Sequence, residues 1–214
     1  MNRVDIMRNY FTPHVCALLV VAAIAGAPAP ARADGFVSPW AAVQFGGQID
    51  NVRADVNRGR GAFGLTAGGM GAGIIGGELD LGYSPSFFGT KNDFGNNTVL
   101  DVMGNVIVGV PFGGTRGGGV RPYVTGGVGL LRTQIDGGTL FNVSSSTNQL
   151  GWNLGGGIMG FFNDHVGLRG DIRYMRAFNG NVINGLDLGS LNFTRLSIGV
   201  IIRSGEEDSG RHGR

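Results

Sequence analysis

Apolar and polar side chains alternate along successive segments of this chain, and that alternation constrains its fold more than any other feature. Between Val99 and Val110 every second side chain is apolar, and Asp101 and Asn105 lie among the residues between them. The same period of two recurs over residues 77–84, 150–161 and 166–174. This period predicts β-strands with one apolar and one polar face.

No stretch after residue 34 shows a sustained helical period, so the sequence predicts an all-β fold. Eight strands are expected, near residues 36–46, 61–70, 74–84, 98–110, 120–132, 149–161, 166–176 and 191–203. Each has about the length of a tilted strand that crosses a bilayer. Long polar connections alternate with shorter ones, the third long connection running from Thr133 to Asn148. This alternation predicts an antiparallel up-and-down transmembrane β-barrel whose long loops share one end, the extracellular one.

The N-terminus has the layout of a secretory signal peptide. Arg3 and Arg8 precede the uncharged run 17–27, and the small-residue triplet 31–33 follows. We expect cleavage after residue 33, a barrel over 34–203 and a polar tail over 204–214. The run is short for a membrane anchor, which remains the alternative. Removing residues 1–33 leaves no cysteine and equal numbers of acidic and basic residues, so nothing in the charge favours a nucleic-acid partner.

The polar faces of the predicted strands favour a barrel with lipid outside and polar groups inside. A water-facing surface is usually rich in lysine, yet this chain has one lysine, Lys91, in a predicted loop. The polar faces carry Gly, Ser, Thr and Asn with a few charges of both signs, which suits a narrow, crowded lumen. We expect these charges to form an ion-pair network across it: Glu78, Asp80, Asp101, Arg121, Arg169, Asp171, Arg173 and Arg195.

Three patterns that suggest enzymes have simpler explanations. The glycine spacing of residues 71–76 matches a dinucleotide-binding loop, but a strand pattern follows it where that motif requires a helix. His165 lies in a predicted tight turn, with no partner histidine for a metal site. The lumen carboxylates are matched by arginines, which favours a structural network over an acid pair of the glycosidase kind. No cofactor is expected.

Aromatic and loop residues suggest contacts at the membrane surface. Seven aromatic residues near predicted strand ends suit the bilayer interface: Trp40, Tyr83, Tyr123, Trp152, Phe161, Phe162 and Tyr174. Two long loops carry possible contact residues for anionic headgroups, lipopolysaccharide or a partner: Arg53, Arg58, Arg60, Phe87, Phe88 and Phe94. Ordinary loop packing and solvated charge explain the same residues equally well.

The chain resembles the small outer-membrane β-barrel family, the OmpA/OmpX-like eight-stranded barrels of Gram-negative bacteria. The resemblance rests on the signal peptide, on the glycine-rich segments 121–130 and 167–174 and on the predicted strand 78–85, and it covers almost all of residues 34–203. It implies outer-membrane insertion by the barrel-assembly machinery and roles in envelope integrity, adhesion or host interaction, with no catalytic residues. Such barrels usually end on an aromatic residue, whereas here the last apolar run ends at Arg203.

The sequence thus predicts a non-enzymatic outer-membrane barrel with a filled lumen that acts in envelope structure or surface interaction through four long loops. Its expected partners are outer-membrane lipid and lipopolysaccharide, the assembly machinery and a surface partner that the sequence does not identify. Two alternatives stay open. One is a narrow channel or a barrel enzyme that acts on lipid, and the other is a secreted soluble barrel that binds an apolar ligand.

Overall fold

The structure is a computed structural model that describes residues 33–49, 52–53, 59–71, 74–85, 96–113, 117–136, 145–178, 182–183, 186–187 and 191–204. Residues 1–32 of the predicted signal peptide and 205–214 of the predicted tail lie outside these ranges. No helix of the described residues is long and apolar enough to cross a membrane.

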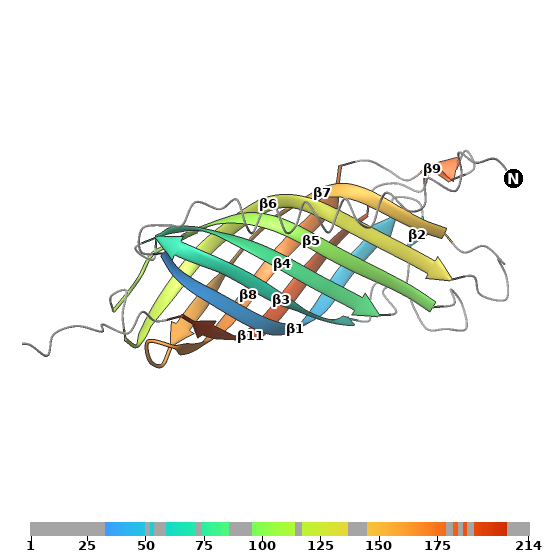
Figure 1. The fold of residues 1–214 in the computed structure, drawn as a ribbon. Coiled ribbons are helices and arrows are strands. Elements are labelled where there is room, and N and C mark those ends of the chain that lie inside the picture. Colours follow the sequence, from blue (N-terminus) through green and yellow to red (C-terminus); the bar gives the residue numbers. More distant parts are fainter. Residues whose placement is uncertain are drawn as a thin grey trace, which may run out of the picture. The chain divides into compact units, whose positions relative to one another are not determined.

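Eight long strands form the wall of a closed barrel (Figure 1). They are β1 (Ala33–Ile49), β3 (Arg60–Gly71), β4 (Ile75–Pro85), β5 (Asn96–Gly109), β6 (Gly119–Asp136), β7 (Ser145–Phe161), β8 (Val166–Ala177) and β11 (Asn192–Arg203). Short β2 (Val52–Arg53) pairs with the end of β1, and β9 (Val182–Ile183) pairs with β10 (Leu186–Asp187). Each long strand pairs antiparallel with its neighbours in the chain, and β11 pairs with β1 to close the ring. The predicted fold class is therefore confirmed.

The strand register closes with a displacement of ten residues. A row of paired residues that starts at Ala177 of β8 and passes through Gly151 of β7 returns, after one circuit, to Gly167 of β8. A staggered register of this kind tilts the strands against the barrel axis, as Figure 1 shows. Eight strands enclose a space that side chains can fill.

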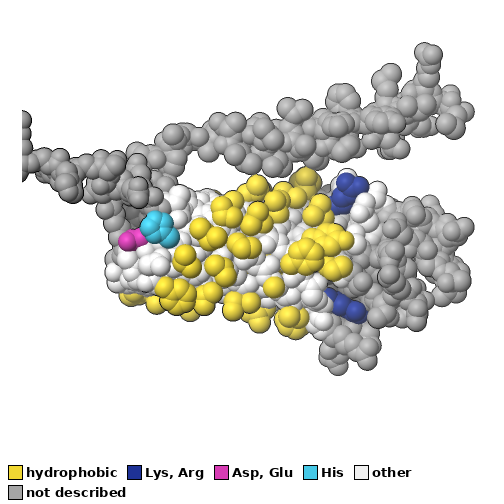
Figure 2. Space-filling view, turned by 60° about the horizontal axis from the view of Figure 1, so that its bottom comes forward, with side chains coloured by type: hydrophobic (Ala, Val, Ile, Leu, Met, Phe, Trp, Pro, Cys, Tyr) yellow, Lys and Arg dark blue, Asp and Glu magenta, His cyan; other side chains and the backbone are white. Residues whose placement is uncertain are grey.

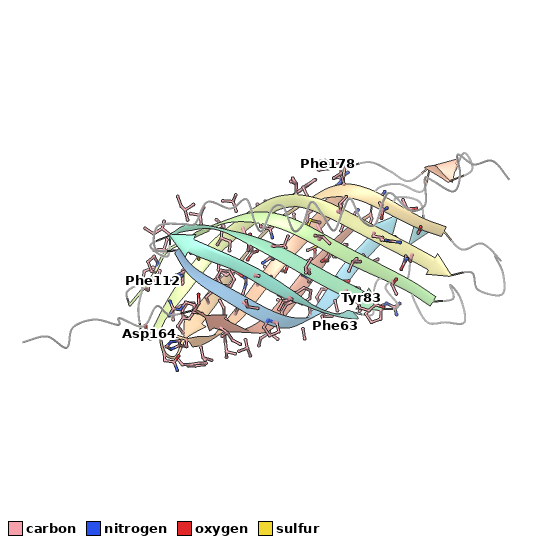
Figure 3. All side chains as sticks on the ribbon, viewed as in Figure 1. Phe63, Tyr83, Phe112, Asp164 and Phe178 are labelled. Carbon is pink, nitrogen blue, oxygen red and sulfur yellow. The ribbon has the colours of Figure 1, made fainter. Side chains whose placement is uncertain are left out.

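The connections differ at the two ends of the barrel. One end, here called the turn end, holds both ends of the barrel chain, the connection after β3 and the turn 162–165. The opposite end, the loop end, holds the connections after β1, β4, β6 and β8. Figure 3 shows Asp164 at the turn end and Phe63 beside Tyr83 at the loop end. The predicted division of the connections between the two ends is confirmed, although the connection after β5 at the turn end, residues 110–118, is longer than the connection after β6 at the loop end, residues 137–144.

The third long connection is shorter than the sequence predicted. Strand β6 continues to Asp136 and β7 begins at Ser145, so the ladder includes the pair Thr133 and Thr147 and reaches the pair Ile135 and Ser145. The prediction ended both strands where apolar residues stop. A β-ladder is held by backbone hydrogen bonds, so it can continue after the side chains become polar.

Each strand separates an outer from an inner face. Along β8 the side chains alternate strictly between exposed and buried, with apolar Leu168, Ile172 and Tyr174 outside and Arg169 and Arg173 inside. Figure 2 shows the resulting apolar belt over the outer wall, with basic side chains at its loop-end boundary. The core is the lumen itself.

Candidate functional site

A layer of paired charges fills the middle of the lumen. It draws on β4, β5, β8 and β11, and its members are less than one-tenth exposed. Its ion pairs join seven of the eight residues expected from the sequence: Glu78, Asp80, Asp101, Arg169, Asp171, Arg173 and Arg195. Strands far apart in sequence are thereby tied across the barrel.

Arg173 and Arg169 together bind the carboxylates on one side of this layer. Arg173 Nη2 lies 2.7 Å from Glu78 Oε1, and Arg169 Nη1 lies 2.8 Å from Glu78 Oε2. Asp171 lies between the two arginines, with its oxygens 3.1 Å from the Nε atom of each. Tyr123 donates its hydroxyl to Asp171 Oδ2 at 2.8 Å. Both carboxylates are therefore compensated on each oxygen, as buried charges require.

Arg195 forms the second half of the layer. Its guanidinium pairs with Asp80 and lies 3.3 Å from both oxygens of Asp101. The indole of Trp40 covers it, with the guanidinium carbon 4.1 Å from the ring centroid, and donates Nε1–H to Asp80 Oδ1 at 3.1 Å. Thr66 donates to the same oxygen at 2.6 Å. Trp40 therefore combines cation–π and hydrogen-bonding contacts inside the lumen.

Glycines on the inner face of β7 make room for the arginines of β8. A Cβ atom on Gly155 would lie 2.8 Å from Arg173 Cγ, and one on Gly157 would lie 2.6 Å from Asp171 Cβ. Separations of this size are too short for carbon atoms in van der Waals contact. These two glycines thus allow close packing of the large lumen side chains of β8.

Apolar layers lie on both sides of the charged layer. Toward the loop end they comprise Val99, Met103, Leu131, Met175, Ala177, Leu191 and Phe193. Toward the turn end they comprise Phe36, Met70, Ile107, Tyr123, Met159, Phe161 and Ile201. The polar strand faces predicted small polar and charged residues inside, so these apolar layers were not expected from the sequence. The signal was present, because methionine and isoleucine interrupt the polar faces at these positions.

Arg121, the eighth residue of the expected network, lies in the turn-end layer. Its Nη1 is 3.6 Å from Met70 Sδ, and its guanidinium carbon is 5.4 Å from the centroid of the Phe161 ring. Arg203 contacts the same ring at 3.9 Å and donates Nε–H to the carbonyl of Asp164 at 3.0 Å. The last residue of β11 is thus attached to the turn between β7 and β8.

The seven aromatic residues separate into two groups. Tyr83, Trp152, Phe162 and Tyr174 lie on the outer wall or in a turn, as predicted. For Trp40, Tyr123 and Phe161 the prediction was wrong, because these side chains are buried in the lumen. Position near a strand end does not fix which face a side chain occupies, whereas the period of two does.

Most of the predicted loop contacts lie outside the described residues. These are Arg58, Phe87, Phe88 and Phe94, while Arg53 is described only as part of the backbone of β2. Arg60 begins β3 at the loop end and is half-buried on the lumen side. His165 is exposed in its turn, as expected. The described residues contain no group of acidic, histidine or cysteine side chains suited to a metal ion.

At the loop end β7 extends beyond β8. Its pairing with β8 begins at Gly151, whereas its pairing with β6 continues from there to Ser145. Phe178 donates its backbone N–H to the carbonyl of Leu150, which places the polar groups of Leu150 on the β8 side. By strand alternation, Ser146 and Asn148 direct their backbone groups the same way. No described residue beyond Phe178 pairs with this edge.

A family model for the outer membrane protein beta-barrel domain matches residues 17–203. The chain belongs to this family and is a protein of the outer membrane. No curated protein sequence matches it.

Solved structures agree on the fold. Neisserial surface protein A is 17% identical with a TM-score of 0.58, the match covering 78% of this chain and 96% of that one. Ail, the attachment invasion locus protein of Yersinia pestis, is 13% identical with a TM-score of 0.53, the match covering 81% and 99%.

Proposed function

We propose that this protein is a non-enzymatic outer-membrane barrel with a closed lumen, acting in envelope structure and surface interaction through its loop end. The filled lumen is the observation that carries this proposal. A solute crossing the barrel would meet an apolar layer, a layer of paired charges and a second apolar layer in turn. Side chains such as Met103, Arg173 and Met159 are fully or almost fully buried there.

The loop end is the part of the molecule that the proposal assigns to contacts with other molecules. It carries four connections and the edge of β7 that no described residue beyond Phe178 pairs with, and we place it on the outside of the cell. Residues 145–149 at this edge are Ser-Ser-Thr-Asn-Gln, with neither charge nor proline. Charge and proline are the usual protection of an exposed edge, so this edge suits pairing with an extended segment of another protein.

The names of the proteins with similar folds are consistent with a surface role. One is a surface protein and another an attachment protein, and the latter is also solved with the heparin analogue sucrose octasulfate. Insertion by the barrel-assembly machinery and contact with lipopolysaccharide belong to the same proposal.

Two measurements test the proposal. The first is ion conductance of the purified barrel in planar bilayers, where we expect none above the leak of the bilayer. A steady unitary conductance would overturn the closed lumen and favour the narrow channel.

The second measurement compares complementation of a gene deletion in the native host by the full protein and by a variant whose long connections are replaced with short glycine-serine turns. Both barrels should restore resistance to detergent, and only the full protein should restore attachment to surfaces. If neither property changes on deletion, the proposed function is wrong.

A further inference from the structure

Two arginines on the outer wall differ from the other strand charges whose side chains the structure describes. Among strand residues whose side chains the structure describes, Arg132 of β6 and Arg176 of β8 are the charged ones on the outer face. An arginine facing lipid near the bilayer midplane costs about 2–4 kcal/mol, and the cost falls toward the interface. Both lie near the loop-end limit of the apolar belt, where a guanidinium can reach the headgroups.

The register places the two arginines at nearly the same level on either side of β7. Arg176 pairs with Trp152, which pairs with Val128, four residues from Arg132 along β6. Because the register shifts by ten residues over eight strands, a row of paired residues descends by about 2.5 residues across two strands, so the two arginines differ in level along the barrel axis by only about 1.5 residues. Within the sheet, four residues along the strand, about 13 Å, and two strand spacings, about 10 Å, place their Cα atoms about 16 Å apart, most of it around the barrel.

The outer surface of β7 between them is amphipathic. Asn148 is exposed and pairs in register with Arg132, while Leu150 and Leu154 are exposed and apolar. Trp152 lies next to Arg176 in register and packs on Tyr174 with ring centroids 5.7 Å apart. Polar groups therefore lie on the part of this surface nearest the loop end, and apolar side chains continue from there toward the turn end.

We propose that this surface binds a lipid with an anionic phosphate headgroup, the phosphate lying between Arg132 and Arg176 and an acyl chain along Leu154. Two positive charges with no acidic side chain on the described outer wall complement a phosphate, and the guanidinium fork suits its oxygens. The apolar strip below favours a lipid over free phosphate. The inference rests on the membrane-embedded barrel and deepens the proposed lipid contacts of its loop end, and it does not depend on the proposed attachment to surfaces.

Trp152 provides the test. The chain has two tryptophans, and Trp40 is shielded in the lumen, so lipids with brominated chains should quench chiefly Trp152. The full barrel is reconstituted in phosphatidylcholine vesicles that contain either brominated phosphatidylglycerol or, at the same fraction, brominated phosphatidylcholine. The ratio of the two quenching values reports enrichment of the anionic lipid at this surface.

We expect enrichment of phosphatidylglycerol in the wild type, and a decrease of its relative binding constant by about fivefold for R132Q or R176Q. R60Q is the matched control, because Arg60 is basic and at the loop end but faces the lumen side. It should keep the wild-type ratio. The shift between cold and boiled samples on SDS gels verifies that every variant is folded.

Two results would overturn the inference. Equal ratios in the wild type and in the R132Q/R176Q double variant would show that the arginines select no lipid. Loss of enrichment on adding inorganic phosphate, at constant ionic strength set with chloride, would assign the surface to free phosphate instead of lipid. Enrichment that survives phosphate and disappears in the double variant supports the lipid site.

Discussion

The two faces of the barrel wall are built from the same strands and obey different rules. The outer face carries apolar side chains at most outward positions, and Val, Ile, Leu and aromatic residues all occur there. On the inner face each large side chain has defined partners, such as Glu78 with Arg169 and Arg173. The outer face therefore requires only that its side chains be apolar, whereas the inner face requires a particular residue at each position.

The largest expected effect breaks the charged layer. Replacing Arg195 with Met leaves Asp101 without its 3.3 Å ion pair and removes a partner of Asp80. Leaving a buried charge without its ion-pair partner typically lowers the free energy of unfolding by about 3–5 kcal/mol. We expect R195M to lose that amount of unfolding free energy, measured by urea titration in vesicles with the SDS gel shift as readout.

The double variant R195M/D101N provides the control for this prediction. With Asp101 made neutral, fewer uncompensated charges remain, so part of the lost stability should return. If R195M alone unfolds at the wild-type urea concentration, the ion pairs of the lumen contribute no stability and the inner face is as tolerant as the outer one.

A charge placed on the outer face tests whether that face requires apolar side chains. Leu154 is 60% exposed in the middle of the belt. We expect L154R to cost about 2–4 kcal/mol in vesicles, because lipid cannot solvate the guanidinium near the midplane. L154V, which stays apolar, should change little. Equal stability of L154R and the wild type would contradict a lipid-facing wall.

The period of two was sufficient to predict the outer face and the strand number, and the alternation of the connections predicted the topology. Arg203 is buried as well but was not among the expected inward charges. The period of two did place all eight expected charges on the inner face of the barrel. It could not give their pairing, since Arg195 and Asp101 are 94 residues apart and meet only through the register. Nor did it predict the methionines of the lumen, because apolar residues are compatible with either face.

Glycine provides a smaller test of the inner face. A Cβ atom on Gly82 would overlap the carboxylate of Asp101, whereas one on the outward Gly160 meets nothing within 4 Å. We expect G82A to cost about 1–3 kcal/mol through overpacking, and G160A to be close to neutral. Urea unfolding curves of the two variants in the same vesicles measure the difference in their unfolding free energies. Equal effects would mean that the lumen can rearrange around an added methyl group.

The smallest effect compares one substitution on both faces of a single strand. On β11, Ile201 is fully buried in the turn-end layer and Ile198 is 65% exposed on the belt. Ile201→Val should cost about 0.5–1.5 kcal/mol, because the rigid lumen cannot close over the missing methylene. At Ile198 an acyl chain can fill the same space, so Ile198→Val should stay within about 0.5 kcal/mol of wild type. Equal losses at the two positions would show that lipid packs against the wall as specifically as the lumen packs against itself.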